Sequence, residues 1–343
     1  MGRVVLVTGV AGRLGSQTAR HLAEDPEVDR VIGVDVLAPR DDLGSVRFVR
    51  ADIRNPVVAK VLVVEDVDTV VHTSILAQPG RAGGRAATKE TNVIGTMQLL
   101  AACQRAPGLR RLVLQSSTTV YGASPHDPAV FTEGTGPKRS PRTGHAKDCT
   151  EVEGYVRGFG RRRPDVSLTV LRCADILGDQ VETSLSHYLR LPAVPTVLGY
   201  DPRLQLLHAD DARAVLHRAA VQDLPGTYNV AGPGVLSLSQ AIRRLGRATV
   251  PVPSFAVPVV GRTLEQAAHV DFSRDQVAFL TYGRVVDTTA LGELFGYAPR
   301  WSTGRTLDDL ASTVGPGPVT AQRVRRVERS LATMAAGRGA GRG

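Results

Sequence analysis

Three glycines near the N-terminus, Gly9, Gly12 and Gly15, have the spacing of a loop that binds the pyrophosphate of a dinucleotide. Gly9 permits a tight turn, Gly12 lets backbone N–H groups approach the phosphates, and Gly15 allows close packing between helix and strand. The N-terminus of the following helix adds positive potential. The sequence therefore predicts a dinucleotide site on this loop, to which Ala11, Arg13 and Leu14 also belong.

An acidic residue, Asp35, stands 20 residues after Gly15 at the end of a short apolar run. A carboxylate there accepts hydrogen bonds from the adenosine ribose and repels a 2′-phosphate, which favours NAD(H). Arg13 and Arg40 are near enough in sequence to offset that repulsion, so NADP(H) stays open. Asp52 and Ile53, after the next apolar run, are expected at the adenine ring.

The first 115 residues alternate between strand and helix patterns. Residues 3–8, 31–34, 46–49, 69–72 and 111–115 predict strands, and residues 14–22, 56–64 and 86–103 predict helices. Such βαβ repetition is typical of an α/β fold, a Rossmann-type doubly wound parallel sheet. We expect this dinucleotide-binding domain to span residues 1–172 with returning segments at about 205–232. A smaller C-terminal substrate-binding lobe is expected at 173–204 and about 233–312, followed by a basic, partly disordered tail at 313–343.

Composition narrows the partners to a small-molecule substrate. The net charge is +9, but six arginines and one acidic residue lie in the last 28 residues, and no basic stripe is interleaved with aromatic residues. This distribution argues against nucleic-acid binding. No apolar run approaches the length of a membrane span, and no signal segment opens the chain, so a cytoplasmic protein is expected. The three cysteines lack the spacing of a metal site, so no metal is expected.

Several further motifs follow the glycine loop in a fixed order. They are Val71-His72, Thr91-Asn92-Val93-Ile94-Gly95-Thr96, Ser116-Ser117-Thr118-Thr119-Val120-Tyr121-Gly122, Lys147 with Glu151, and later Gln205 to Asp211 and Leu294 to Pro299. On these residues the chain resembles the extended short-chain dehydrogenases/reductases, a family that includes nucleotide-sugar epimerases and dehydratases. The resemblance covers about residues 1 to 312.

The resemblance implies roles for individual residues. Ser117 matches the serine that hydrogen-bonds the substrate oxygen, and Lys147 matches the lysine that binds the nicotinamide ribose. In the family a tyrosine stands four residues before that lysine as the proton donor, and here that position is Thr143. We therefore expect Ser117, Thr143 and Lys147 as catalytic residues without the usual acid. Thr73, Ser74 and Asn92 are expected at the cofactor.

No nearby residue restores the missing tyrosine. Between Tyr121 and Lys147 there is no other tyrosine, and Tyr155 lies about 12 Å along a helix from Lys147. His145 is a weaker replacement acid, because two residues from Thr143 and from Lys147 it points away from their face.

Three residues are expected at the substrate besides Ser117: Tyr121, Asp175 and Tyr188. Relatives that bind nucleotide sugars commonly have asparagine where this chain has Asp175, and proline where it has Asp179. Two carboxylates beside a diphosphate would weaken its binding, unless they pair with nearby arginines.

Three function classes remain. The favoured one is an NAD(P)H-dependent ketoreductase acting on an aromatic or polyketide-like ketone, with the proton coming from water or the substrate. In this respect the chain resembles atypical ketoreductases of the simocyclinone 7-ketoreductase type. The alternatives are a nucleotide-sugar epimerase or dehydratase with displaced acid/base groups, and a non-catalytic NAD(P)-binding regulator or scaffold. The resemblance also implies a possible homodimer through helices near 86–106 and 146–160.

Overall fold

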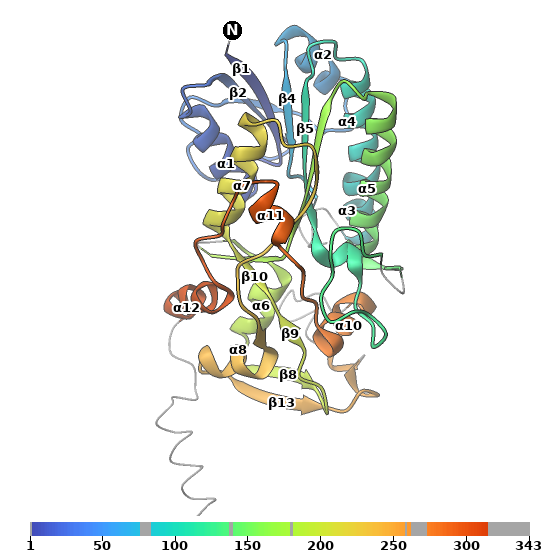
Figure 1. Cartoon of the computed structure of the whole chain (residues 1–343), viewed down its shortest axis with the longest axis vertical. Coiled ribbons are helices and arrows are strands. Elements are labelled where there is room, and N and C mark those ends of the chain that lie inside the picture. The colour runs from blue at the N-terminus through green and yellow to red at the C-terminus, as the bar shows by residue number, and fades with distance from the viewer. Residues whose placement is uncertain are drawn as a thin grey trace, which may run out of the picture.

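The computed structural model describes residues 2–75, 84–136, 140–178, 181–257, 259–261 and 273–314. Its centre is a seven-stranded sheet in the order β11-β6-β5-β4-β1-β2-β3 (Figure 1). All neighbouring strands in this sheet are parallel. The strands are β1 (Arg3–Thr8), β2 (Val28–Asp35), β3 (Arg47–Arg50), β4 (Thr69–His72), β5 (Arg111–Ser117), β6 (Ser167–Cys173) and β11 (Gly226–Val230). The predicted Rossmann-type α/β fold is confirmed.

The strand order reverses between β1 and β4, which are neighbours in the sheet although two strands separate them in the chain. Their carboxyl ends are level, because Thr8 of β1 is in register with His72 of β4. In open α/β sheets the ligand crevice forms at such a reversal, outside the carboxyl ends of the strands. The glycine loop begins at this point, directly after Thr8.

Helices cover both faces of the sheet because its central strands are apolar on both sides. On one face lie α1 (Arg13–Ala23) and α7 (Ala209–Val221), and on the other lie α2 (Val57–Val64), α4 (Gly95–Gln104) and α5 (Gly144–Arg162) (Figure 1). Each layer has its own buried core. None of the helices in the described ranges is long and apolar enough to cross a membrane.

The helical segment predicted at residues 86–103 is divided into three parts. Helix α3 (Arg85–Lys89) passes into a π-helical turn, Glu90–Ile94, before α4 begins. A π turn adds a residue to the helical repeat and re-aims the side chains around it. Here the buried side chain of Asn92 is directed toward α5.

Short strand pairs form the region below the sheet in Figure 1. They are β7 (Asp175–Leu177) with β10 (Leu206–His208), β9 (Arg203–Leu204) with β12 (Leu236–Ser237), and β8 (Ala193–Val197) with β13 (Ala248–Val252). The accompanying helices are α6 (Ser184–Arg190), α8 (Leu238–Arg244), α10 (Arg274–Tyr282), α11 (Thr289–Glu293) and α12 (Thr303–Thr313). The division into domains stays a prediction, and the tail beyond Val314 lies outside the described residues.

Candidate functional site

One cleft runs from the glycine loop to the region below the sheet. Its walls come from the loop after β1, the end of β5, the start of α5, β7 and α10. Of the residues predicted from the sequence, eight line this cleft: Gly9, Gly12, Arg13, Leu14, Gly15, Thr73, Ser117 and Asp175. We call it the central cleft.

The glycine loop has the tight backbone that its sequence predicts. Gly9 has a φ of +82°, a conformation that favours glycine, and its carbonyl accepts a hydrogen bond of 3.0 Å from the Gly12 N–H. A Cβ atom on Gly15 would lie 2.3 Å from the Gly9 carbonyl oxygen. The Thr73 hydroxyl donates to the Thr8 carbonyl at 2.6 Å, which fixes the end of β4 against the loop. Ser74 also lies against Gly9.

The acidic residue at the end of β2 is oriented toward the loop. The Asp35 carboxylate accepts a hydrogen bond of 2.9 Å from the Ala11 N–H. Arg13 forms an ion pair with Asp41 at 2.7 Å, so a neighbouring carboxylate already balances its charge. Arg40 is exposed. The charge balance near Asp35 is therefore less positive than the two arginines alone predict.

Asp52 and Ile53, predicted at the adenine ring, and Asn92, predicted at the cofactor, contact other residues of the protein. Asp52 pairs with Arg54 at 2.6 Å, and hydrogen bonds from Arg54 lower the pKa of the Asp52 carboxyl. Ile53 is buried. Asn92 is buried as well and donates a hydrogen bond of 3.0 Å to Asp148 of α5. Neither Ile53 nor Asn92 lines the central cleft.

Ser117 is the last residue of β5, and its side chain opens into the central cleft. Its hydroxyl oxygen accepts a hydrogen bond of 3.2 Å from the Thr119 N–H, which leaves its own proton available to donate. The serine thus stands at the carboxyl edge of the sheet, in the same cleft as Gly12 and Gly15.

Thr143 does not share the central cleft with Ser117. It is exposed, and both its N–H and its hydroxyl donate to one carboxylate oxygen of Asp275, at 2.9 and 3.0 Å. It borders a separate hollow with Arg274 and Tyr282. The structure therefore differs from the expected catalytic position, because the hydroxyl of Thr143 is bound to α10.

Lys147 also lies outside the residues that line the central cleft. Its ammonium is 3.6 Å from Glu151, one turn further along α5, and Lys89 approaches the same carboxylate at 3.8 Å. The Lys147 side chain is 41% exposed. The expected contact with a nicotinamide ribose therefore stays a prediction.

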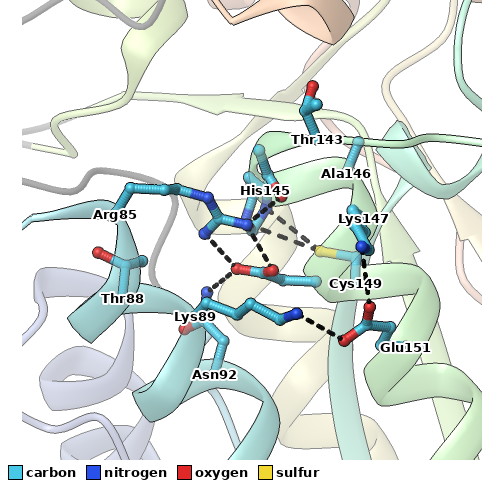
Figure 2. A network of polar contacts seen from close by, with 12 residues as sticks. Arg85, Thr88, Lys89, Asn92, Thr143, His145, Ala146, Lys147, Cys149 and Glu151 are labelled. Atoms are coloured by element: carbon cyan, nitrogen blue, oxygen red, sulfur yellow. Dashed lines mark hydrogen bonds and ion pairs between the residues drawn. The ribbon is translucent and has the colours of Figure 1, made fainter.

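An ionic network with one buried member, Asp148, links α5 to α3 (Figure 2). Arg85 binds both carboxylate oxygens of Asp148 at 2.6 Å and donates to the Gly144 carbonyl at 2.7 Å. The Asp148 side chain has no exposed surface. This network fixes α5 against α3, and in this arrangement the Lys147 ammonium lies beside Glu151 and outside the central cleft.

Another residue of α5, His145, lines the central cleft. Its Nε2 lies 3.3 Å from the Sγ atom of Cys149, one turn along the helix (Figure 2). Burial raises the pKa of the Cys149 thiol, which therefore stays neutral beside the ring. His145 lines the central cleft, whereas Thr143 and Lys147 do not.

Two tyrosines expected at the substrate are packed into the protein instead. Tyr121 is 1% exposed, donates to Asn229 at 2.7 Å and accepts from Arg172 at 2.8 Å. Burial raises the pKa of its phenol. Tyr188 has no exposed surface and donates to the Pro195 carbonyl. The structure places neither ring in the central cleft.

The central cleft contains a half-buried acid and a buried cation that come from different elements. Asp175 of β7 lines it, and burial raises the pKa of the Asp175 carboxyl, although the charge of Arg284 acts in the opposite direction. Arg284 follows α10 and is 8% exposed. The sequence carries no signal for Arg284, because it stands in no periodic segment or motif. Asp179 lies outside the described residues. No group of three or more potential metal ligands occurs in the described ranges.

Comparison with known proteins agrees with this geometry. The model of the NAD dependent epimerase/dehydratase family matches residues 5–231. An uncharacterized protein of Mycobacterium tuberculosis is 49% identical over 321 residues, which covers 92% of this chain and 85% of that protein. The dTDP-glucose 4,6-dehydratase of Escherichia coli is 28% identical over 262 residues, 66% of this chain and 71% of the enzyme.

Solved structures share the fold. The UDP-glucose 4-epimerase of Thermotoga maritima has a TM-score of 0.69 at 19% identity, covering 90% of this chain and 97% of that one. The NAD complex of the dTDP-glucose 4,6-dehydratase from Bacillus anthracis also has a TM-score of 0.69, at 18% identity, covering 91% and 96%. With its glycine loop, parallel sheet and family match, this chain belongs to the NAD dependent epimerase/dehydratase family.

Proposed function

We propose that this protein is an NAD(P)-dependent oxidoreductase that transfers hydride between a nicotinamide and a carbon bearing an oxygen held by Ser117. One observation carries the proposal: the cofactor loop and Ser117 open into the same cleft. A dinucleotide whose pyrophosphate lies at Gly12 would extend from there along the carboxyl edge of the sheet. Ser117 stands on that edge and has a proton to donate.

NAD(H) is the cofactor that the charges favour. Asp35 stands at the end of β2, where the adenosine ribose binds in this fold. Arg13 is paired with Asp41, which reduces its attraction for a 2′-phosphate. The family description and the NAD complex of the Bacillus anthracis relative agree with this choice.

For the reaction we favour reduction of a ketone on an aromatic or polyketide-like small molecule. The residue at the position of the family's tyrosine, Thr143, has its hydroxyl bound to Asp275 and lies outside the central cleft. A conjugated or phenolic ketone delocalises the negative charge that develops on its oxygen, so it needs no strong acid from the protein. The proton then comes from water, from the substrate or from His145, which lines the cleft.

A nucleotide-sugar epimerase or dehydratase is the second candidate. The names of the relatives favour it, since both the Escherichia coli and the Thermotoga maritima proteins are named for nucleotide-sugar reactions. Asp175 opposes it, because this carboxyl replaces an asparagine of such enzymes and lines the cleft. A cofactor-binding protein without turnover is the third.

The test is an assay of NADH oxidation at 340 nm with quinone-like and phenolic ketones, in parallel with UDP-glucose and dTDP-glucose. We expect NADH oxidation with at least one ketone and no NADH oxidation with either nucleotide sugar. Tight retention of NAD through purification together with conversion of a nucleotide sugar would favour the epimerase or dehydratase. Cofactor binding without turnover of any compound would favour the third candidate, a cofactor-binding protein without catalytic activity.

A homodimer through α4 and α5 is part of the proposal. Three apolar side chains on or beside these helices are exposed: Ile94, Met97 and Tyr155. Isolated exposed apolar residues are common, but two adjacent helices that carry several of them favour a subunit contact. Light scattering of the purified protein measures the mass directly.

A further inference from the structure

Arg284 is a buried cation whose hydrogen-bonding capacity is mostly unused. Its residue is 8% exposed, and it lines the central cleft. A guanidinium has five N–H donors. In the described part of the chain, one of them is engaged: Nη1 donates to the Gly122 carbonyl at 2.9 Å. The guanidinium also lies 4.7 Å from the centre of the Phe279 ring.

Among the described residues, carboxylates act on this guanidinium only through space and none is hydrogen-bonded to it, although acidic groups line the same cleft. Asp175 is the acidic group whose charge affects Arg284 most, and burial favours the uncharged form of Asp175. Asp275 is occupied by the two hydrogen bonds from Thr143. Glu182 also lines the cleft. Arg284 is therefore largely buried without a carboxylate partner, an arrangement that costs free energy unless a ligand supplies the missing charge.

The position of Arg284 is close to the reacting end of the cleft. Gly122, to which it is bonded, follows the short 3-10 turn Thr118–Tyr121, and that turn begins directly after Ser117. The guanidinium also acts electrostatically on Cys149, the neighbour of His145. The cation is thus held by the segment that carries the serine, beside the face of α5 that enters the cleft.

We propose that Arg284 binds a carboxylate of the substrate, so that the protein acts on an acidic small molecule. A guanidinium matches a carboxylate in shape, because two parallel N–H groups meet its two oxygens. A single negative charge balances Arg284. A diphosphate brings more negative charge than Arg284 can balance into a cleft that also holds Asp275, and it would be repelled there. The inference rests on the proposed function only in assuming that the substrate occupies the central cleft.

The test measures anion binding without requiring turnover. Benzoate and its neutral counterpart benzamide are titrated into the NADH-loaded protein and into the protein alone, with saturation-transfer NMR as the readout. We expect benzoate to bind at least tenfold more tightly than benzamide. Arg284→Gln should weaken benzoate at least tenfold, and Arg284→Lys should weaken it less because it keeps the charge.

A matched control is Arg305→Gln, since Arg305 also lies over an aromatic ring, 5.1 Å from the centre of Trp301, but outside the central cleft. It should leave benzoate binding unchanged. Unaltered NADH affinity and circular dichroism of Arg284→Lys would show that the cleft is intact.

Three results would overturn the inference: absent benzoate binding, equal binding of benzoate and benzamide, or equal benzoate binding by wild type and Arg284→Gln. Tighter binding of uridine diphosphate that depends on Arg284 would assign the cation to a diphosphate instead, which also contradicts it. Hydride transfer to neutral ketones that is unaffected by Arg284→Gln would keep the proposed function and refute this inference. Arg284-dependent benzoate binding without hydride transfer to any ketone would keep this inference and refute the proposed function.

Discussion

Thr143 and Asp275 are joined by two hydrogen bonds to a single carboxylate oxygen, one from the threonine N–H at 2.9 Å and one from its hydroxyl at 3.0 Å. Thr143 is the N-cap residue of α5, yet its side chain does not cap that helix. Asp275 lies in the first turn of α10. Thr143 therefore connects the sheet-covering helix α5 to α10, a helix of the region below the sheet.

Replacing Thr143 by valine should have a structural effect and little catalytic effect. The substitution removes the hydroxyl and keeps the shape and the backbone N–H. We expect a loss of about 1 kcal/mol in the free energy of unfolding, the usual value of one hydrogen bond. Hydride transfer should change by less than about threefold, because the hydroxyl is outside the central cleft. Urea unfolding and steady-state kinetics measure the two effects. A loss in kcat of tenfold or more, with normal stability, would return Thr143 to the catalytic site.

Replacing Ser117 by alanine should lower the rate of hydride transfer. Ser117 is the hydroxyl at the strand edge that lines the cleft and is free to donate. Loss of one donor to a developing oxyanion typically lowers kcat by about 100-fold. We expect that reduction with an unchanged NADH dissociation constant. If Ser117→Ala reduces ketones at the wild-type rate, the carbonyl binds elsewhere in the cleft.

Gly15→Ala should weaken cofactor binding. The new Cβ would lie 2.3 Å from the Gly9 carbonyl oxygen and 2.9 Å from the Thr73 hydroxyl, so the loop must move. We expect the NADH dissociation constant to rise at least tenfold by fluorescence titration, and the melting temperature to fall. Gly134→Ala is the matched control, because no atom lies within 4 Å of its new Cβ. Equal effects of the two substitutions would contradict the assigned role of the loop.

Lys147→Gln separates the observed placement of this lysine from the role that the family implies. In the structure the ammonium is 3.6 Å from Glu151, outside the cleft. We therefore expect the NADH dissociation constant to change by less than about threefold, since an exposed pair of this kind contributes little. Glu151→Gln should change it equally little. A tenfold loss for Lys147→Gln alone would show that the lysine leaves Glu151 and binds the cofactor.

The stability of the protein should fall in mild acid because of His72. This residue is 1% exposed and lies between the hydroxyls of Thr8 and Thr96, at 2.7 and 2.9 Å. Burial lowers its pKa from 6.5 to about 4. The unfolded chain therefore takes up the proton first, and the stability present above pH 6.5 is lost as the pH falls toward about 4.

The expected loss from this group is about 3 kcal/mol between these two pH values. His72→Asn removes the titrating group and keeps a polar side chain. Urea unfolding of both proteins at several pH values isolates the contribution, since other groups titrate in both. Parallel stability curves for the two proteins would disprove the role of His72.

Much of the dinucleotide half follows from local sequence. β1 and β4 have the bounds that their apolar runs predict, Arg3–Thr8 and Thr69–His72, because a strand buried on both faces needs a continuous apolar segment. The glycine loop is equally local, since the turn and the approach of Gly15 to Gly9 involve neighbouring residues. These features determined the fold class and the expected cofactor, whereas the strand predicted over 111–115 extends in the structure to Ser117.

The tertiary structure decided which side chains share the central cleft. The motif around Lys147 predicts a role for this lysine. However, α5 is held against α3 by the ion pair between Arg85 and Asp148, which are 63 residues apart. Arg284 is held at the cleft by a hydrogen bond to the carbonyl of Gly122, 162 residues away in the sequence. Such contacts have no periodicity in the sequence. They depend on groups far apart in the sequence that only the folded chain brings together.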